Sequence, residues 1–283
     1  MSTTAVAHQL SLFTPAKEQI QPFLRWAGGK RWLTRDYRYL FDGAIRGKYI
    51  EPFLGGGSVF AAVQPDRGIL SDYNDDLVNL YRQIRDRGEY FRDEMQRLEK
   101  LHSREFYYQM RNSKPVEDLQ RAVWLLYLNR TCFNGIYRVN GEGVFNVPIG
   151  TKTNLDLPAD NFAGWARALN NVDILRADFE IVIARAGEGD LIYADPPYTI
   201  SQTHNGFAEY NATPFSMSDQ VRLRDSLAAA HNRGARVVAT NAAHPSIVDL
   251  YKDSFRIIEV SRSNTIAATA TNRGIYNEII IHS

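Results

Sequence analysis

Cysteine is almost missing from this 283-residue sequence, in which Cys132 is the single one. One cysteine cannot form a disulfide within the chain or supply a zinc site built on cysteine. The six histidines include no H-x-E pattern with a C-x-x-C partner, which excludes a zinc deaminase. Cys132 has no histidine near it in sequence, so we interpret it as structural and expect no metal site.

Long apolar runs are missing too. No stretch approaches the ~20 apolar residues that a membrane helix requires. The first residues, MSTTAVAHQLSLFTPAKEQ, lack the charged beginning and the continuous apolar core of a signal peptide. We therefore expect a cytoplasmic protein with no membrane partner, whose residues 1–20 form a flexible arm.

A surplus of charge of either sign is the third absence. The formal net charge is +1, with 23% charged and 44% hydrophobic residues. This composition is typical of a globular protein with one large domain or one domain with an insertion. A net charge near zero neither indicates nor excludes a nucleic-acid partner, because local clustering of charge decides binding.

The sequence does contain an alternation of apolar runs and helical patterns. Runs bounded by turn residues predict strands at 48–53, 67–73, 171–178, 190–198, 235–241, 255–261 and 276–283. A helical pattern at 218–234 is expected to begin with Ser218 as its N-cap and to stop at Gly234. Strands that alternate with helices predict an α/β fold with a mainly parallel sheet.

The block at 74–161 breaks this alternation. It contains helical patterns and no clear strand, and it ends in a polar stretch rich in Gly and Asn. A helical block within an α/β pattern predicts an inserted subdomain, which divides the main domain into 21–73 and 162–283.

The stretch LIYADPPYT, at 191–199, ends a predicted strand on Asp195 and stiffens the next residues with two prolines. The Asp195 carboxylate and the carbonyls of Asp195 and Pro196 offer acceptors with almost no donors, a set suited to an amino group. Tyr198 adds a ring face on which a planar base can stack. We interpret this order as a clamp for an amino group and not merely as a rigid turn with a capping acid.

The stretch EPFLGGGS, at 51–58, follows another predicted strand, and its glycines allow a tight turn close to a ligand. It is not a P-loop, because no Lys-Ser/Thr pair follows the glycines. Asp72 closes the next strand at a spacing typical of a carboxylate that binds ribose hydroxyls. Together these features indicate an adenosine-type cofactor without distinguishing a nicotinamide dinucleotide from S-adenosylmethionine.

The stretch FLRWAGGKRWL, at 23–33, offers Trp26 for packing on a flat or apolar ligand and Lys30 as a cation. Two glycines between them bend the chain. This composition favours a loop that binds a carboxylate or a phosphate over a solvated turn before a helix.

Taken together and in this order, these stretches resemble the Dam-type DNA adenine-N6 methyltransferases of the alpha group. The resemblance is carried by RWAGGKR (25–31), YIEPFLGGGSVF (49–60), SDYNDDLVNLY (71–81), NRTCFNGIYRVN (129–140), FNVPIG (145–150) and YADPPY (193–198). It implies a class I S-adenosylmethionine-dependent methyltransferase fold, with 74–161 as an inserted, mainly helical target-recognition domain. The implied reaction is methyl transfer from S-adenosylmethionine to N6 of an adenine flipped out of double-stranded DNA, in a bacterial or phage protein.

The resemblance also implies roles for individual residues. The donor-binding set would be Trp26, Lys30, Phe53, Gly55, Gly57, Asp72, Asp178, Phe179 and Asp195. The catalytic residues that hold the target base would be Asp195, Pro196 and Tyr198. A hairpin at about 133–150 would read the DNA through Phe133, Asn134, Arg138, Asn140 and Pro148. Its GEGV turn and the surroundings of Tyr137 differ from members that methylate GATC, so no recognition sequence is predicted.

Other functions stay open at this point. Cytosine N4 and adenine N6 of RNA present the same chemical problem as adenine N6 of DNA, and a catalytically silent DNA-binding module is the alternative outside the enzymes. A dehydrogenase lacks support, because we find neither a catalytic His nor a Tyr-x-x-x-Lys pair. For partners beyond DNA, we expect a monomer and keep open a cognate restriction endonuclease in the same system.

Overall fold

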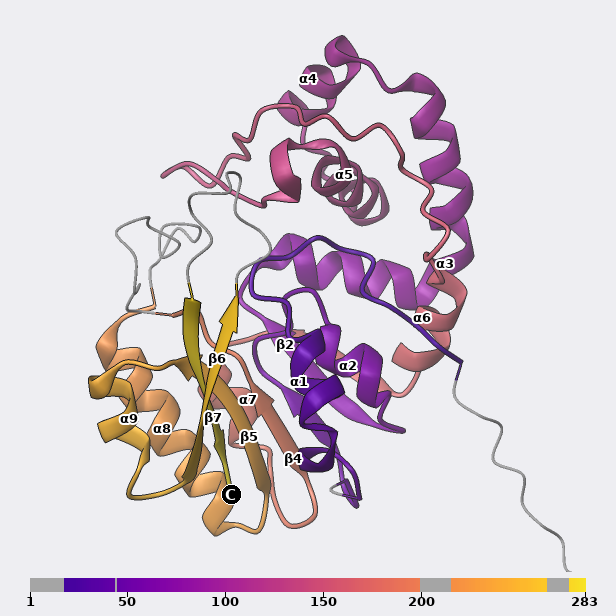
Figure 1. Ribbon diagram of the computed structural model, residues 1–283. Coiled ribbons are helices and arrows are strands. Elements are labelled where there is room, and N and C mark those ends of the chain that lie inside the picture. The colour runs from indigo at the N-terminus through magenta and orange to yellow at the C-terminus, as the bar shows by residue number, and fades with distance from the viewer. Residues whose placement is uncertain (1–17, 44, 199–214, 264–274) are drawn as a thin grey trace, which may run out of the picture.

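The computed structural model describes residues 18–43, 45–198, 215–263 and 275–283 (Figure 1). Its strands are β1 (Tyr49–Glu51), β2 (Gly68–Asp72), β3 (Val172–Arg176), β4 (Leu191–Ala194), β5 (Arg236–Ala242), β6 (Arg256–Ser263) and β7 (Ile275–His282). Its helices are α1 (Arg31–Asp36), η1 (Arg38–Leu40), α2 (Ser58–Val63), α3 (Asp75–Leu101), α4 (Arg104–Asn112), α5 (Asp118–Thr131), η2 (Phe133–Gly135), α6 (Phe162–Leu169), α7 (Phe179–Ile183), α8 (Met217–Asn232) and α9 (Pro245–Tyr251). The predicted strands and the α/β fold class are confirmed.

The strands form a single sheet within the described residues, in the order β3-β2-β1-β4-β5-β7-β6. Neighbours from β3 to β5 are parallel, and β7 runs antiparallel to both β5 and β6. The chain passes from β1 to β2 on one side, and β4 lies on the other side of β1. In open α/β sheets, ligands bind at such a switch point, beyond the carboxyl ends of the strands.

Alternating strand residues bury themselves against helices on both faces, as expected for a covered parallel sheet. Tyr49, Leu70 and Tyr193 belong to the core shared with α1, α2, α3 and α6. Ile50, Ile69 and Ile192 belong to the core shared with α7, α8 and α9. The two faces make a three-layer α/β/α arrangement, which is consistent with the class I methyltransferase fold.

The helical block stands apart from the sheet, beyond one of its ends in the view of Figure 1. Helix α3 is broken at Arg87, where φ is −145° and ψ is 37°. Its first half runs beside the sheet, and its second half turns away toward α4 and α5 (Figure 1). The residue after the break is Gly88, where a Cβ would lie 2.5 Å from the Phe162 carbonyl oxygen. The absence of a side chain at Gly88 therefore allows α3 to pack closely on α6.

One predicted helix boundary is wrong. The N-cap of α8 is Ser216 and not Ser218. Ser216 Oγ accepts from Asp219 N, and Asp219 Oδ2 accepts from Ser216 N at 2.9 Å, which makes a reciprocal capping box. The helix stops as predicted, with Gly234 at a φ of +92° just beyond it. Among the described helices, none is long and apolar enough to span a bilayer.

Candidate active site

Four loops meet at the carboxyl ends of β3, β2, β1 and β4, which are neighbours in the sheet. They carry Asp178, Asp72, the glycine loop 54–57 and Asp195, all of which the sequence singled out. Parallel strands end at the same edge, so residues far apart in the chain share one crevice.

The glycine loop is held tightly against its surroundings. Gly55 and Gly57 have φ values of +49° and +63°, which side chains rarely allow. A Cβ on Gly55 would lie 3.1 Å from Trp26 Cδ1, so Trp26 packs directly on this loop. Gly55 N donates to Asp72 Oδ2 at 3.0 Å, and Tyr81 Oη donates to the Gly55 carbonyl at 3.2 Å. The loop therefore presents its backbone in a fixed shape.

Asp72 supports both the loop and the next helix. Besides Gly55 N, its carboxylate accepts from Asn74 N at 3.0 Å, just before α3 begins. Burial raises the pKa of the Asp72 carboxyl, and these backbone N–H groups oppose the rise by stabilising the carboxylate. Each carboxylate oxygen has two acceptor sites, so these contacts leave Asp72 able to accept from a ligand.

Asp195 follows β4 and is fixed by two donors. Thr240 Oγ1 of β5 donates to Asp195 Oδ1 at 2.7 Å, and Lys30 Nζ lies 3.0 Å from Asp195 Oδ2. Burial raises the pKa of this carboxyl, while the Lys30 charge and the Thr240 hydroxyl pull it back. The two donors keep Asp195 an acceptor with a defined orientation.

Lys30 connects Asp195 with Tyr198. Its Nζ lies 5.1 Å from the centroid of the Tyr198 ring and 3.6 Å from Glu278 Oε2. Tyr198 Oη donates to the same oxygen of Glu278 at 3.0 Å. Burial, together with the Asp195 and Glu278 charges, holds the pKa of Tyr198 well above its usual range, so the phenol stays protonated. Sequence reasoning missed Glu278, although a charged residue in the apolar run YNEIIIHS was a signal.

Glu51, the last residue of β1, was also missed. It is buried and accepts a hydrogen bond from Tyr49 Oη at 2.8 Å. Burial holds its pKa well above the usual range, and the nearby charges of Asp195 and Asp72 raise it further. Three acidic groups thus gather at the ends of β1, β2 and β4. The signal in the sequence was an acid at the end of a buried strand, directly before a proline.

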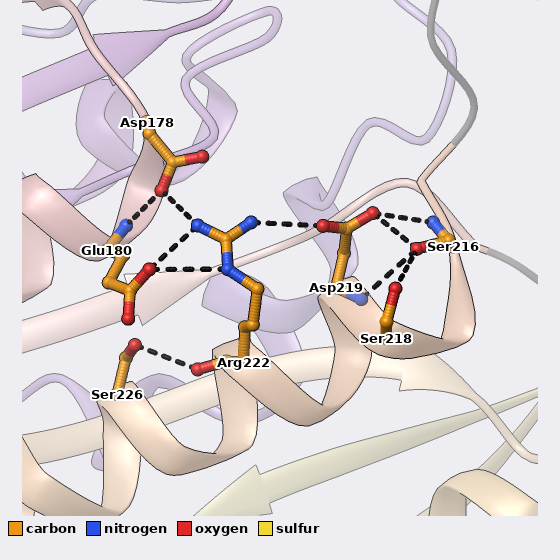
Figure 2. Close-up of polar contacts among 7 residues, drawn as sticks. All are labelled: Asp178, Glu180, Ser216, Ser218, Asp219, Arg222 and Ser226. Carbon is orange, nitrogen blue, oxygen red and sulfur yellow. Dashed lines mark hydrogen bonds and ion pairs between the residues drawn. The ribbon is translucent and has the colours of Figure 1, made fainter.

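Asp178 and Phe179 open α7, as Figure 2 shows for Asp178. Asp178 Oδ1 accepts from Glu180 N at 2.9 Å, which caps the helix, and pairs with Arg222 of α8 at 2.9 Å. The Arg222 guanidinium lies between the carboxylates of Asp178 and Glu180 on one side and that of Asp219 on the other (Figure 2). Its distance to Asp219 is 3.0 Å. No feature of the sequence pointed to Arg222, because the pairing depends on how α8 packs beside α7.

Phe179 lies in a small aromatic group beside this network. Its ring centroid is 5.5 Å from that of Phe53 and 5.7 Å from that of Phe215. The Arg222 guanidinium carbon lies 4.8 Å from the Phe179 centroid. Phe53 and Phe179, both of which the family resemblance assigns to the donor site, are therefore neighbours.

The predicted DNA-reading residues all lie in one irregular hairpin. Two isolated antiparallel β-bridges, Cys132–Ile149 and Val139–Phe145, hold its two sides together. Phe133 N donates to the Pro148 carbonyl at 2.9 Å, and the Phe133 side chain is 49% exposed. Asn134 has a left-handed φ of 55°. These features place an apolar ring on the surface at the beginning of the hairpin.

Arg138 and Asn140 differ in how free their side chains are. Arg138 is exposed, and its Nε donates to Asn146 Oδ1 at 2.9 Å. Asn140 Oδ1 accepts from Glu142 N at 3.1 Å and Val144 N at 2.9 Å, so it builds the turn of the hairpin. Arg138 is thus the better placed of the two to reach an external ligand.

Cys132 is buried at the beginning of this hairpin, and burial raises the pKa of its thiol to about 12. A thiol this hard to ionise is a poor nucleophile, in agreement with a structural role. In the part of the chain that the structure describes, no group of three or more acidic, His or Cys side chains is arranged to hold a metal ion.

Comparison with known proteins addresses the family directly. Residues 26–266 match the family described as D12 class N6 adenine-specific DNA methyltransferases. A type II methyltransferase, M1.LlaDCHI of Lactococcus lactis subsp. cremoris, is 34% identical over 96% of this chain and 98% of its own length. The DNA adenine methylase of Serratia marcescens is 32% identical over 91% of this chain and 96% of its own.

A third relative is longer. The DNA N-6-adenine-methyltransferase of Escherichia phage P1 is 35% identical over 94% of this chain but only 36% of its own length. The family match spans the glycine loop, the helical block and the Asp195–Tyr198 motif together. This chain therefore belongs to the D12 class of N6 adenine-specific DNA methyltransferases, as the resemblance in its sequence predicted.

Proposed function

We infer that this DNA adenine methyltransferase uses S-adenosylmethionine as methyl donor and that Asp195, Pro196 and Tyr198 hold the flipped adenine. The observation that carries this assignment is the fixed position of Asp195, held by Lys30 at 3.0 Å and Thr240 at 2.7 Å beside the glycine loop.

The acids at the strand ends fit this donor. When bound, S-adenosylmethionine supplies an electrophilic methyl group on a positively charged sulfonium, next to an ammonium group. The charges of Asp72 and Asp195 raise the pKa of Glu51, and a cationic ligand would make its ionisation less costly. The backbone of Gly55 and Gly57 offers a close approach, and Trp26 closes the loop from outside.

The adenosine part of the donor is assigned to Asp72 and to the Asp178–Phe179 corner. Asp72 accepts from the ribose hydroxyls. Among the described residues, Glu180 N and Arg222 both contact Asp178 at Oδ1, so we assign Oδ2 to the adenine amino group. Phe53 and Phe179 offer ring surface beside it, with Arg222 fixing the carboxylate. Lys30 belongs to both sites, because its Nζ contacts Asp195 and its backbone N donates to Ser58 Oγ at the beginning of α2.

The base site must make a weak nucleophile reactive. N6 of adenine is delocalised into the ring, and acceptors at Asp195 and the Pro196 carbonyl favour a more tetrahedral nitrogen whose lone pair faces the methyl group. The bound donor would supply the methyl group for the new N–C bond and would keep the electron pair of the broken C–S bond, while N6 would lose a proton to solvent. Asp195 acts as an acceptor and orienter, so no strong base is required.

Flipping the adenine costs a few kcal/mol, because its stacking and pairing are lost. Stacking on Tyr198 returns roughly 1–3 kcal/mol. The exposed ring of Phe133 is suited to fill the space that the base vacates, and Arg138 is suited to contact a base edge or a phosphate. We accordingly assign 74–161 as the target-recognition domain and 21–73 with 162–283 as the catalytic domain.

The test expresses the protein in a host without DNA methylation and maps modified bases by direct sequencing. We expect N6-methyladenine in one sequence context. Asp195→Ala should lower kcat about 10²–10³-fold, because the main acceptor for the N6 hydrogens is gone. The matched control is Asp42→Asn, an exposed acid paired with Arg38 and remote from the crevice, which should methylate normally. Near-normal turnover by a folded Asp195→Ala, or methyl groups on cytosine N4, would contradict the proposal.

The partners follow from the same function. The name of the Lactococcus lactis relative, a type II methyltransferase, supports a role in restriction-modification with a cognate endonuclease. We propose that the methyltransferase acts as a monomer, which light scattering of the protein alone and with a duplex tests. A dimer at working concentration would overturn that part of the proposal only.

A further inference from the structure

Tyr137 lies in the DNA-reading hairpin, yet its side chain packs toward the proposed donor site. Its ring is stacked on Trp26, with centroids 5.5 Å apart and planes 25° apart. Its hydroxyl donates to Asp76 Oδ2 at 3.2 Å, in the first turn of α3. Burial and the Asp76 charge raise the pKa of Tyr137, which keeps the phenol protonated as a donor. One side chain of the hairpin thus touches two segments of the donor site.

Both segments are in contact with the glycine loop. A Cβ on Gly56 would lie 3.0 Å from Trp26 Cβ, so Trp26 fills the space over the loop. Asp76 follows Asp72 on the same short segment, and Asp72 Oδ2 accepts from Gly55 N at 3.0 Å. A shift of Tyr137 would therefore displace the loop from two directions.

Asn129, near the end of α5, makes a second connection. It is buried, and its Oδ1 accepts from Arg25 N at 2.9 Å while its Nδ2 donates to the Arg25 carbonyl at 2.8 Å. The same Nδ2 donates to the Gly135 carbonyl at 3.0 Å. Asn129 thereby fixes the residue before Trp26 to the beginning of the hairpin, two residues after Phe133.

We propose that Tyr137 and Asn129 are positioning residues that couple DNA recognition to donor binding. DNA that binds the hairpin would hold Trp26 against the glycine loop through the Tyr137 ring, and the donor would hold the hairpin in its DNA-binding position in return. Coupling of this kind is reciprocal: each ligand changes the affinity for the other by the same factor. The inference rests on the proposed function, since it requires S-adenosylmethionine and DNA to share the protein.

The experiment measures the Kd of S-adenosylhomocysteine, the unreactive product, by titration calorimetry. It is measured for the free protein and for the protein saturated with a DNA duplex. This duplex carries the sequence in which the sequencing experiment found N6-methyladenine. The ratio of the two constants is the coupling factor, and we expect wild type to lie within about 5–150-fold. Tyr137→Leu removes both the stack and the hydroxyl contact and should bring the factor close to one.

Two further variants make the result specific. Tyr39→Leu changes an exposed tyrosine remote from the crevice and should keep the wild-type factor. Tyr137→Phe retains the stack on Trp26 and should give an intermediate factor. A merely structural role of Tyr137 would weaken each ligand separately and leave the ratio unchanged, so an unchanged ratio in Tyr137→Leu overturns the inference.

If Tyr137→Leu shows no cooperative unfolding transition, it is not folded, and the test is then made with Tyr137→Phe. That variant removes only the Asp76 contact, so a lowered ratio supports the coupling and an unchanged ratio overturns it. A wild-type ratio of one overturns the coupling alone. Failure of wild type to bind S-adenosylhomocysteine would overturn the proposed function, and the coupling with it.

Discussion

Three acids of the crevice lie in different surroundings, which make the ionised form of each carboxyl group more or less favourable. Asp195 faces the Lys30 ammonium and the Thr240 hydroxyl, so its ionised form is supported. Asp72 accepts backbone N–H groups. Glu51 accepts from a tyrosine hydroxyl and lies near the charges of the other two. Glu51 is thus the acid of the three most strongly driven to hold its proton.

The raised pKa of Glu51 predicts a pH dependence of stability. The unfolded chain loses this proton near pH 4.5, whereas the folded protein keeps it to much higher pH. The folded state then binds the extra proton, so the free energy of unfolding falls as pH rises above about 4.5, by up to about 1.4 kcal/mol per pH unit. Glu51→Gln keeps an acceptor for Tyr49 but removes the titration.

Urea unfolding of wild type and Glu51→Gln between pH 5 and pH 8 measures this effect. The variant should gain stability relative to wild type as the pH rises. The control, Glu89→Gln, changes an exposed acid of α3 and should follow the wild-type curve. Parallel curves for wild type and Glu51→Gln would show that Glu51 is ionised in the folded protein.

Sequence reasoning found Asp72, Asp178 and Asp195 because each one ends an apolar run, but it did not find their partners. Tyr198 and Glu278 are 80 residues apart, and Lys30, directly before α1, meets Asp195, which follows β4. Strand order is decided by packing on both faces, which no local pattern contains. Glu51 and Glu278 were visible as acids in apolar strands, yet their roles depend on this neighbourhood.

At the scale of elements, too, local sequence patterns predicted some features, whereas others depend on tertiary packing. The existence and type of each strand followed from apolar runs, since burial on both faces leaves a continuous pattern. The break in α3 at Arg87 did not follow, because it depends on how closely Gly88 approaches α6. Ser216 and Ser218 both precede a helical pattern, and only the entry of the chain into α8 distinguishes them.

The capping box of α8 gives the prediction at this scale. Ser216→Ala removes the acceptor for Asp219 N and should lower the free energy of unfolding by about 1 kcal/mol. Ser218→Ala is the matched control, because Ser218 Oγ contacts Ser216 Oγ at 2.7 Å and caps no backbone group in the box. Chemical unfolding of the two variants compares them. A larger loss for Ser218→Ala would restore the boundary that the sequence predicted.

At the scale of the molecule, the chain from 18 to 30 runs between the helical block and the sheet (Figure 1). Trp165 Nε1 of α6 donates to the Gln21 carbonyl at 2.8 Å, and Arg130 of α5 donates to the Phe23 carbonyl at 3.2 Å. Arg25 is held by Asn129 at the same place. This segment thus fastens the block to the main domain immediately before it supplies Trp26 and Lys30 to the site.

Arg130 contacts the 18–30 segment at Phe23 and also holds the helical block together from within, so its loss should destabilise the whole molecule. It forms a two-point ion pair with Asp160, at 2.7 and 2.8 Å, and both side chains are only 2% exposed. Arg130→Met leaves the Asp160 carboxylate buried without this partner and should cost about 3–5 kcal/mol in urea unfolding. Arg38→Met, which breaks a pair with Asp42 whose side chains are 70% and 61% exposed, should cost less than about 1 kcal/mol. Adding Asp160→Leu to Arg130→Met should recover part of the lost free energy of unfolding, because it removes the unpaired Asp160 carboxylate. Recovery stays partial, because the Phe23 carbonyl and the Leu155 carbonyl still lose the donors that Arg130 gave them. Equal costs for Arg130→Met and Arg38→Met would mean that the buried Arg130–Asp160 pair contributes no more to stability than an exposed pair.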